Sequence, residues 1–470
     1  MPLVESFSGI RGIYDDGLDE QVSLRYAYSY FSFLKKKYSG KLKIVIGTDT
    51  RPSRRILRSA VIEALCCEII DLGVASTPMV EFAVRHFKAD GGIIITASHN
   101  EPYWNGFKFL DKDGSVLKAK DMDAIIKNYN KIKKLSNNDF FDKYLYENIN
   151  PESFKLKKVI KKYEEINKKY SDYVLGFISK QDKDKIKNSK LKIVIDPNGG
   201  AGIIAKQVIG RLGVNVKGVN MDYGIFNRAV EPTEDSLFYL ANEIRDGKYD
   251  FAAGFDCDAD RVEIMTTKGL VSGNQLLALI ADNLLKNSKR KIIVANNATS
   301  LVVREIAKKH KAKYVEVDVG ETNVVQEMYK LKAPIGGEGS SGGVIIPDSR
   351  CRDGILTLIY LLKILASKGK KLDDLIKELP EFYNIKRKVD FDSKKEKKIF
   401  KKLKGYYNKK GCKIITKGSG LKVMPDNDSF ILFRASKTEA NLLRIIADAP
   451  NRKQVEAMVE EALGLIKNQQ

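Results

Sequence analysis

A short β-branched segment occurs three times along the chain, at residues 43–46, 192–195 and 291–294. Each copy continues into a polar or glycine-containing turn and then into a helical pattern. Continuous apolar runs of this length are typical of parallel strands that are buried on both faces. The recurrence therefore predicts an α/β fold that contains three similar units.

Within each unit a second apolar strand leads into a loop of unusual composition. The loops are Thr-Ala-Ser-His-Asn at 96–100, Asp-Cys-Asp-Ala-Asp-Arg at 256–261 and Gly-Gly-Glu-Gly-Ser-Ser-Gly-Gly at 336–343. Ligands of open α/β sheets bind at the carboxyl ends of the strands, so these loops are candidate functional segments. From about residue 380 the sequence pattern changes: a Lys-rich helical stretch is followed by a strand at 430–433. This pattern predicts a smaller α+β domain.

The composition excludes several classes of protein. Five irregularly spaced cysteines argue against a disulfide framework and against a zinc ribbon. The presence of only three histidines argues against a His-rich metal site. The apolar stretch around 355–362 is too short to cross a bilayer, and the first residues lack a secretion signal. We therefore expect a cytoplasmic protein that makes no use of a membrane.

The formal net charge of +22 has two interpretations. Scattered lysines on amphipathic segments are typical of a solvated surface, which is also compatible with ligands that carry phosphate. The alternative is a nucleic-acid-binding protein, but the sequence shows no ribonucleoprotein signature and no basic zipper, so the solvated surface is favoured and no nucleic-acid partner is expected.

Three carboxylates alternate in the second loop, at Asp256, Asp258 and Asp260. In an extended segment such side chains project to one side. Hard oxygen ligands in this arrangement suit Mg²⁺ better than zinc. A calcium EF-hand is excluded, because its sixth position requires glycine and is Arg261 here. An acidic turn without a metal is the alternative, but its three like charges would repel one another, so a metal site is favoured.

In the first loop, Ser98 follows a strand and Lys108 lies ten residues further along. A serine at a strand end, next to His99, is either a nucleophile or the cap of a turn or helix. A cationic amine near such a serine could neutralise a phosphoryl oxygen or carry a proton. This motif alone favours capping.

Two further segments hold polar groups that suit a sugar phosphate. The glycines around Glu338 and Ser341 favour hydrogen bonds to a polyol, with a glycine hairpin as the alternative. Dinucleotide and hydrolase motifs also match this loop but are rejected, because a short strand stopped by proline follows it instead of a helix. In the last domain, Arg434, Ser436 and Thr438 suit a phosphate group, with a capped turn as the alternative.

Taken in this order, the four loops resemble those of the α-D-phosphohexomutases. This family includes phosphoglucomutase, phosphomannomutase and phosphoglucosamine mutase. Ser-Gly-Ile-Arg-Gly at 8–12 and Gly-Thr-Asp-Thr-Arg-Pro-Ser at 47–53 are also similar to motifs of the family. The resemblance covers essentially the whole chain. It implies an isomerase with three similar α/β domains of mixed sheets and a smaller C-terminal α+β domain, around one central cleft.

The resemblance also implies a reaction. Ser98 would be phosphorylated in the resting enzyme and exchange its phosphoryl group with the 1- and 6-hydroxyls of a hexose phosphate, through a hexose 1,6-bisphosphate that turns around. The resemblance implies one Mg²⁺ per chain, held by Asp256, Asp258, Asp260 and Ser98. Lys108 and His99 would handle protons, and Arg11 and Arg261 would support the transferring group.

The resemblance also implies how the substrate is bound. Glu338 and Ser341 would contact sugar hydroxyls, and Arg434, Ser436 and Thr438 would anchor a phosphate.

The implied domains are a phosphoserine domain (1–153), a metal-loop domain (154–253), a sugar-binding-loop domain (254–375) and a phosphate-binding domain (376–470). A hexose 1,6-bisphosphate is expected as activator, a phosphosugar as substrate, and a monomer or homodimer as the assembly.

Some positions depart from the family pattern. Cys257 replaces a usual glycine, glycine replaces the last histidine of the sugar loop, and Ala440 replaces a proline. Glucose or mannose phosphate is the expected substrate, and glucosamine phosphate is the alternative.

Overall fold

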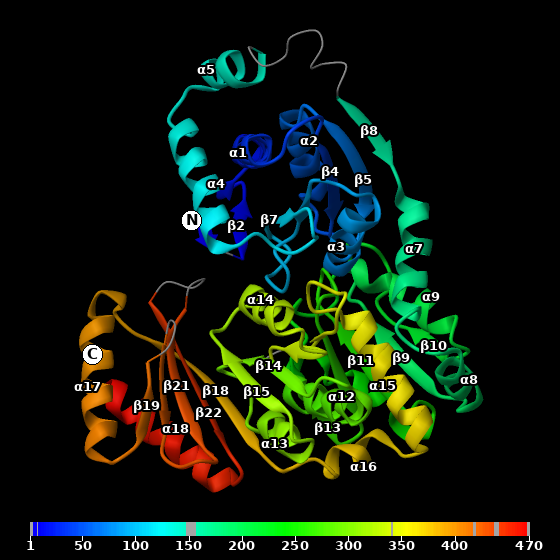
Figure 1. Ribbon diagram of the computed structural model, residues 1–470, viewed down its shortest axis with the longest axis vertical. Coiled ribbons are helices and arrows are strands. Elements are labelled where there is room, and N and C mark those ends of the chain that lie inside the picture. Colours follow the sequence, from blue (N-terminus) through cyan, green and yellow to red (C-terminus); the bar gives the residue numbers. More distant parts are fainter. Residues whose placement is uncertain are drawn as a thin grey trace. The chain divides into compact units, whose positions relative to one another are not determined.

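The computed structural model describes residues 3–6, 8–146, 157–339, 342–416, 420–436 and 441–467 (Figure 1). The chain forms two compact units. The first comprises Met1–Leu270 together with Ile345–Lys370, and the second comprises Val271–Val344 together with Lys371–Gln470. The segment 345–370 therefore returns to the first unit after the chain has entered the second.

The first unit begins with an eight-stranded mixed sheet in the order β1-β2-β7-β6-β4-β5-β8, in which β3 pairs with β2. Its central strand β4 is parallel to β5 and β6, whereas β7 is antiparallel to β6. The strands are β1 (Val4–Ser6), β2 (Gly9–Tyr14), β3 (Gly17–Leu18), β4 (Lys43–Thr48), β5 (Glu68–Val74), β6 (Gly91–Ile95), β7 (Trp104–Asp111) and β8 (Lys158–Lys161).

Helices cover both faces of this sheet. The inner strands carry apolar residues on both faces, and these residues are buried by the helices. Ile44 and Ile46 of β4 belong to the core formed with the three helices on one face, while α3 packs against β4 and β6. The helices are α1 (Glu20–Lys37), α2 (Arg54–Ala64) and α4 (Ala119–Ile132) on the first face and α3 (Thr77–His86) on the other, followed along the chain by α5 (Asn137–Phe140) and the π-helical η1 (Phe141–Tyr146).

A second, five-stranded sheet completes the first unit, in the order β10-β9-β11-β12-β13. Its strands are β9 (Lys192–Asp196), β10 (Asn215–Gly218), β11 (Phe251–Phe255), β12 (Val262–Thr266) and β13 (Gly269–Val271). The returning segment supplies α15, which packs against α7, α8 and β12. The helices are α7 (Tyr163–Leu175), α8 (Lys180–Asn188), α9 (Ile204–Gly210), α10 (Glu234–Leu237), α11 (Leu240–Glu243) and α15 (Gly354–Lys368), with 3₁₀ turns η2 (Ala201–Ile203) and η3 (Arg245–Gly247).

The second unit contains a four-stranded sheet in the order β15-β14-β16-β17. In all three α/β sheets the opening strand lies between the next strand along the chain and the strand that ends in the candidate loop. This shared order confirms the three similar units. The elements are β14 (Ile292–Asn296), β15 (Lys313–Val317), β16 (Ile335–Gly337), β17 (Val344–Ile345), α12 (Gly273–Asn287), α13 (Val302–Lys309), α14 (Glu321–Leu331) and α16 (Leu372–Lys377).

The loop predicted at 336–343 begins later than expected. Strand β16 runs from Ile335 to Gly337, so the first two residues of that predicted loop belong to the strand. Its glycines fit because a Cβ on Gly336 would come within 2.3 Å of the Met328 sulfur, so α14 packs directly on the strand. Glycines that indicate a loop in the sequence here permit a close helix–sheet contact.

The C-terminal sheet is antiparallel, in the order β18-β22-β21-β20-β19. Figure 1 shows α17 and α18 beside it, and their apolar residues form one core with one face of the sheet. This confirms the α+β character of the last segment. The elements are β18 (Tyr383–Asp390), η4 (Ser393–Lys395), α17 (Glu396–Lys409), β19 (Lys413–Ile415), β20 (Gly420–Met424), β21 (Phe430–Ala435), β22 (Leu442–Ala449) and α18 (Arg452–Lys467).

Candidate active site

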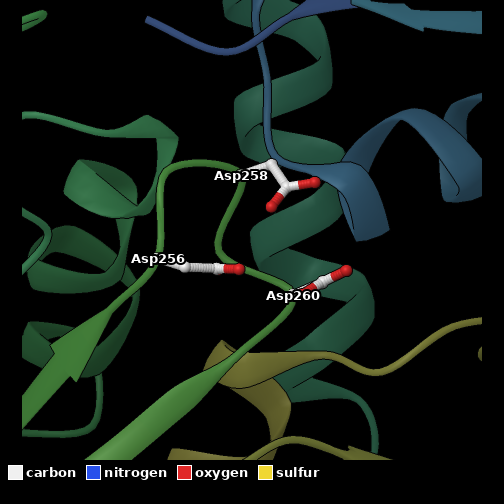
Figure 2. A group of neighbouring side chains, drawn as sticks. All are labelled: Asp256, Asp258 and Asp260. Carbon is white, nitrogen blue, oxygen red and sulfur yellow. The ribbon is translucent and has the colours of Figure 1, made fainter. Parts of the chain in front are cut away.

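The three aspartates lie in the loop that joins β11 to β12. Asp256, Asp258 and Asp260 are all buried, and one carboxylate oxygen from each lies within 4.8 Å of the others. Figure 2 shows Asp256 and Asp260 near the two ends of the loop and Asp258 at its tip. Ala259 has a φ of 54°, a left-handed conformation that turns the chain sharply between the last two carboxylates.

The donor set fits a hard divalent cation. Among the described residues, Oδ1 of Asp258 and Oδ1 of Asp260 are buried and accept no hydrogen bond. A buried carboxylate oxygen without a hydrogen bond is costly, and a cation among these oxygens would reduce that cost. Oxygen-only ligands are those that Mg²⁺ prefers, so the triad could hold this ion.

Lys108 of β7 lies beside the triad. Its Nζ donates to Asp258 Oδ2 at 2.8 Å and to Asp260 Oδ2 at 3.2 Å. The hydroxyl of Thr77, at the start of α3, donates to the same Asp258 oxygen at 2.7 Å. The structure therefore brings a predicted lysine to the aspartates, and the first two sheets of the first unit meet at this point.

The carboxylates differ in their electrostatic surroundings. Burial and the charges of Asp260 and Asp258 raise the pKa of Asp256 well above its usual value. Burial alone would also raise the pKa of Asp260, but the charges of Arg352, Lys108 and Arg261 outweigh it and hold that pKa below its usual value. Asp256 thus needs additional positive charge to ionise easily, which a bound divalent cation would supply.

Ser98 lies in the loop between β6 and β7 and is 2% exposed. Its Oγ donates to Asp256 Oδ2 at 3.3 Å, although the two residues are 158 positions apart. Ser98 has a φ of 55°, and its backbone N donates to Thr96 Oγ1 at 2.8 Å. The serine therefore does not cap a helix; it projects its hydroxyl toward the triad.

Two predicted arginines lie close to these groups. Arg261 Nε is 3.8 Å from Asp256 Oδ2 and 3.8 Å from Asp260 Oδ1. Arg11 of β2 donates from Nη1 to Asn100 Oδ1 at 2.7 Å, two residues beyond Ser98. Burial and the charge of Arg261 lower the pKa of Arg11 to about 10, so it remains a cation at neutral pH. His99 directly follows Ser98, and its role in proton handling stays a prediction.

Sequence reasoning missed several residues of this site. Thr77 is one, and Arg352 is another, since its Nη2 donates to Asp260 Oδ2 at 3.4 Å. Arg228 is a third: it donates to the carbonyl of Phe255 at 2.7 Å, immediately before the first aspartate. No motif indicates these three residues. The sequence offered one signal beside Arg352: its neighbour Asp353 stands before an apolar run, as a helix cap would. Asp353 does cap α15, because it accepts a hydrogen bond from the Leu356 N–H at 2.9 Å.

The predicted sugar-binding residue Glu338 lies in the second unit, directly after β16. Its Oε1 accepts hydrogen bonds from Asn296 Nδ2 at 2.7 Å and from the Gly320 N–H at 2.9 Å. Asn296 ends β14 and is fully buried, so the carboxylate is held at the carboxyl edge of the sheet. Ser341, the other predicted sugar contact, lies outside the described residues.

The predicted phosphate anchor lies on β21 and just beyond it. Arg434 is directly opposite Arg444 of β22, and the Ser436 N–H donates to the Leu442 carbonyl at 2.8 Å. Burial lowers the pKa of Arg434, and the positive charge of Arg444 acts in the same direction. Two facing guanidinium groups suit an anionic ligand. Thr438 lies outside the described residues.

Family models match three parts of the chain: phosphoglucomutase/phosphomannomutase α/β/α domain I at residues 5–136, domain II at 168–269 and domain III at 272–383. A phosphoglucomutase/phosphomannomutase of Thermococcus kodakarensis is 33% identical over 98% of this chain and 97% of its own length. The chain belongs to the phosphoglucomutase/phosphomannomutase family. Members of this family of phosphohexomutases are isomerases that transfer a phosphoryl group within a hexose phosphate, so the predicted enzyme class is confirmed.

Two further similarities agree with membership of the phosphohexomutase family. A phosphoglucosamine/phosphogalactosamine mutase of Sulfurisphaera tokodaii is 30% identical over 98% of this chain and 98% of its own length. A crystal structure of a phosphoglucomutase/phosphomannomutase family protein from Burkholderia thailandensis, 21% identical, covers 99% of this chain and 97% of that chain with a TM-score of 0.81. The latter confirms the predicted fold, and family membership favours an enzyme over a nucleic-acid-binding protein.

The aspartate loop falls inside the segment that matches domain II of the phosphohexomutase models. The predicted domain boundaries at 153, 253 and 375 stay predictions. Among the described residues, none of the helices combines the length and the apolar character that crossing a membrane requires.

Proposed function

We propose that the protein interconverts the 1- and 6-phosphates of a hexose through a phosphoserine at Ser98 and a hexose 1,6-bisphosphate intermediate. The observation that carries this proposal is the buried contact of 3.3 Å between Ser98 Oγ and Asp256 Oδ2. It places a hydroxyl next to three carboxylates that could hold a cation. Phosphoryl transfer depends mainly on positioning and on neutralising charge, and both are available at this position.

The proposed cycle has two transfers. First, the free hydroxyl of the hexose phosphate attacks the phosphorus on Ser98, the bond from phosphorus to the serine oxygen breaks, and the hydroxyl loses its proton. The bisphosphate then turns around, and Ser98 Oγ attacks its other phosphate, which releases the isomeric monophosphate. A hexose 1,6-bisphosphate would act as activator by loading the serine. Lys108 and His99 are the groups we propose for holding and moving protons.

One Mg²⁺ per chain would be held by Asp256, Asp258 and Asp260 with an oxygen on Ser98. When bound, the ion would supply positive charge beside the transferring phosphoryl group. Arg11 and Arg261 add positive charge near residues 96–103, the serine loop between β6 and β7, since they contact Asn100 and the aspartates respectively.

The remaining contacts to substrate that we propose concern the sugar hydroxyls and the second phosphate. Glu338 and Ser341 would bind sugar hydroxyls, and Arg434, Ser436 and Thr438 would bind the phosphate that does not react. Glu338 is already fixed by two hydrogen bonds, so it could accept from a sugar hydroxyl without much reordering. The monomeric or homodimeric state and the cytoplasmic location stay predictions.

We expect the enzyme to act on glucose or mannose 1-phosphate with a kcat/KM at least ~10-fold above that for glucosamine 1-phosphate, because a site built for a hydroxyl leaves polar groups unpaired around a different substituent. Similarity to the Thermococcus kodakarensis protein supports this order of preference. The measurement is a steady-state comparison of the three substrates with one preparation, primed with hexose 1,6-bisphosphate. Preference for the amino sugar would identify a phosphoglucosamine mutase instead, and no turnover of any of them would refute the proposed function.

Replacing Lys108 with methionine keeps the side-chain stem and removes the charge that contacts two aspartates. We expect kcat to fall ~100-fold, since a positioned cation or proton carrier contributes about this much to transfer. The measurement is kcat across a Mg²⁺ titration, so that weaker metal binding is separated from slower chemistry. Lys112→Met, at an exposed position just after β7, is the control and should retain full activity. A Lys108→Met enzyme with wild-type kcat would remove this residue from the mechanism.

A further inference from the structure

Arg51 is a completely buried arginine in the segment between β4 and α2. Its Nε donates to Asp49 Oδ2 at 2.9 Å, and its backbone N–H donates to Asp49 Oδ1 at 3.0 Å. Asp49 is also fully buried, and its N–H donates to the carbonyl of Ile95 at the end of β6. The pair is therefore fixed at the carboxyl edge of the sheet, where the serine loop begins.

The two terminal nitrogens of the Arg51 side chain donate to four backbone carbonyls, three in the serine loop and one on the first residue of β7. Its Nη2 donates to the carbonyls of Ser98 at 2.7 Å and Asn100 at 2.5 Å. Its Nη1 donates to the carbonyls of Glu101 and Trp104, the latter at 3.0 Å. A guanidinium has five N–H donors in a rigid plane. Here they are matched by one carboxylate and four carbonyls, so a single side chain fixes the whole segment between β6 and β7.

This arrangement matters because Ser98 adopts an unfavourable backbone conformation. Its φ of 55° lies in the left-handed region, which residues other than glycine adopt only when their surroundings hold them there. Thr96 Oγ1 accepts from the Ser98 N–H, and Arg51 donates to the Ser98 carbonyl. The backbone is thus held on both sides of the side chain that reaches Asp256.

We propose that Arg51 is a positioning residue for phosphoryl transfer: it holds the serine loop so that Ser98 Oγ faces the aspartates, and Asp49 orients it. The inference rests on the proposed function of Ser98. It assigns a physical role to the 47–53 motif, for which neither the sequence nor the family match supplies one. Arg51 acts only through the loop, because its donors are already occupied by Asp49 and the four carbonyls.

The test compares Arg51→Lys and Arg51→Met with a matched control, Arg58→Met. Arg58 also forms an ion pair with a fully buried aspartate, Asp71, in the same sheet, but that pair does not include the serine loop. The measurements are kcat and KM, together with amide hydrogen exchange of residues 96–104 without substrate. Thermal unfolding of each variant reports the general loss of stability.

In both Arg51 variants we expect kcat to fall ~100-fold with KM changed less than about threefold, because small displacements of a reacting group cost about this much. Exchange in 96–104 should accelerate at least ~10-fold, as expected for a segment that loses buried hydrogen bonds. Arg58→Met should keep kcat within about twofold and leave exchange in 96–104 unchanged, even at a similar loss of thermal stability.

Wild-type exchange in 96–104 and a near wild-type kcat in a folded Arg51→Met enzyme would overturn the proposal. If the methionine variant does not fold, the lysine variant decides by the same two criteria, since its ammonium still neutralises Asp49 but cannot reach all four carbonyls. A wild-type enzyme without mutase activity would refute the proposed function instead, and exchange of the loop would then still show whether Arg51 holds it.

Discussion

Ser98→Ala is expected to lower mutase turnover at least ~10⁴-fold, because the residue that forms the covalent intermediate is removed. The side chain is 2% exposed, and its hydroxyl lies beside the aspartate triad. The fold should change little, since the alanine loses only one weak hydrogen bond to Asp256. Mg²⁺ binding should weaken but persist, because the three aspartates remain when the proposed ligand oxygen on Ser98 is removed.

The measurement combines turnover with an intact-mass spectrum. Purified wild-type enzyme should contain a species heavier by one phosphoryl group, and incubation with hexose 1,6-bisphosphate should increase it. Ser98→Ala should lack this species under both conditions. Ser59→Ala, at an exposed position of α2, is the control and should retain both the phosphate and the activity. A phosphorylated Ser98→Ala protein would show that the nucleophile has been assigned to the wrong residue.

Asp258→Asn should lower kcat ~1,000-fold and weaken Mg²⁺ binding ~100-fold, because one ligand charge is lost and an amide nitrogen now faces cations. Oδ2 of this residue already accepts from Lys108 and Thr77. An asparagine can keep only one acceptor oxygen, so either these donors or the metal loses its partner. The loss therefore exceeds that expected for a surface carboxylate.

Calorimetric titration with Mg²⁺ and kcat at saturating metal separate the two effects, and circular dichroism checks the fold. Asp235→Asn, which makes the same charge change at an exposed position of α10, should match the wild type in each measurement. If Asp258→Asn kept near wild-type activity, the assignment of the metal ligands would be wrong.

Much of the fold could be predicted because its signal is local. The apolar segments at 43–46, 192–195 and 291–294 became the central strands of three sheets, and the strand predicted at 430–433 lies within β21. The alternation of Asp256, Asp258 and Asp260 likewise predicted converging carboxylates, which the structure shows. In each case the information lies in neighbouring residues and in the period of the backbone.

The parts that the sequence did not predict depend on contacts between distant segments. Arg352 reaches Asp260 only because the chain returns to the first unit, and Thr77 reaches Asp258 from another sheet. The left-handed backbone of Ser98 has no local signal, since serine rarely adopts it. The sequence also does not predict the contacts of Arg51 with backbone carbonyls, because it does not indicate whether an arginine is buried or exposed.

The return of residues 345–370 to the first unit has a consequence for how the protein is made. On the ribosome, the chain emerges from its N-terminus, so Val271–Val344 leaves the exit tunnel before α15 does. Folding of the first unit therefore cannot be completed until that helix has emerged. The aspartate loop at 256–260 likewise lacks its contact with Arg352 until then. Release of a polypeptide terminated before residue 345 would therefore yield a first unit with an uncovered apolar surface, a substrate for chaperones and proteases rather than an independent half-enzyme.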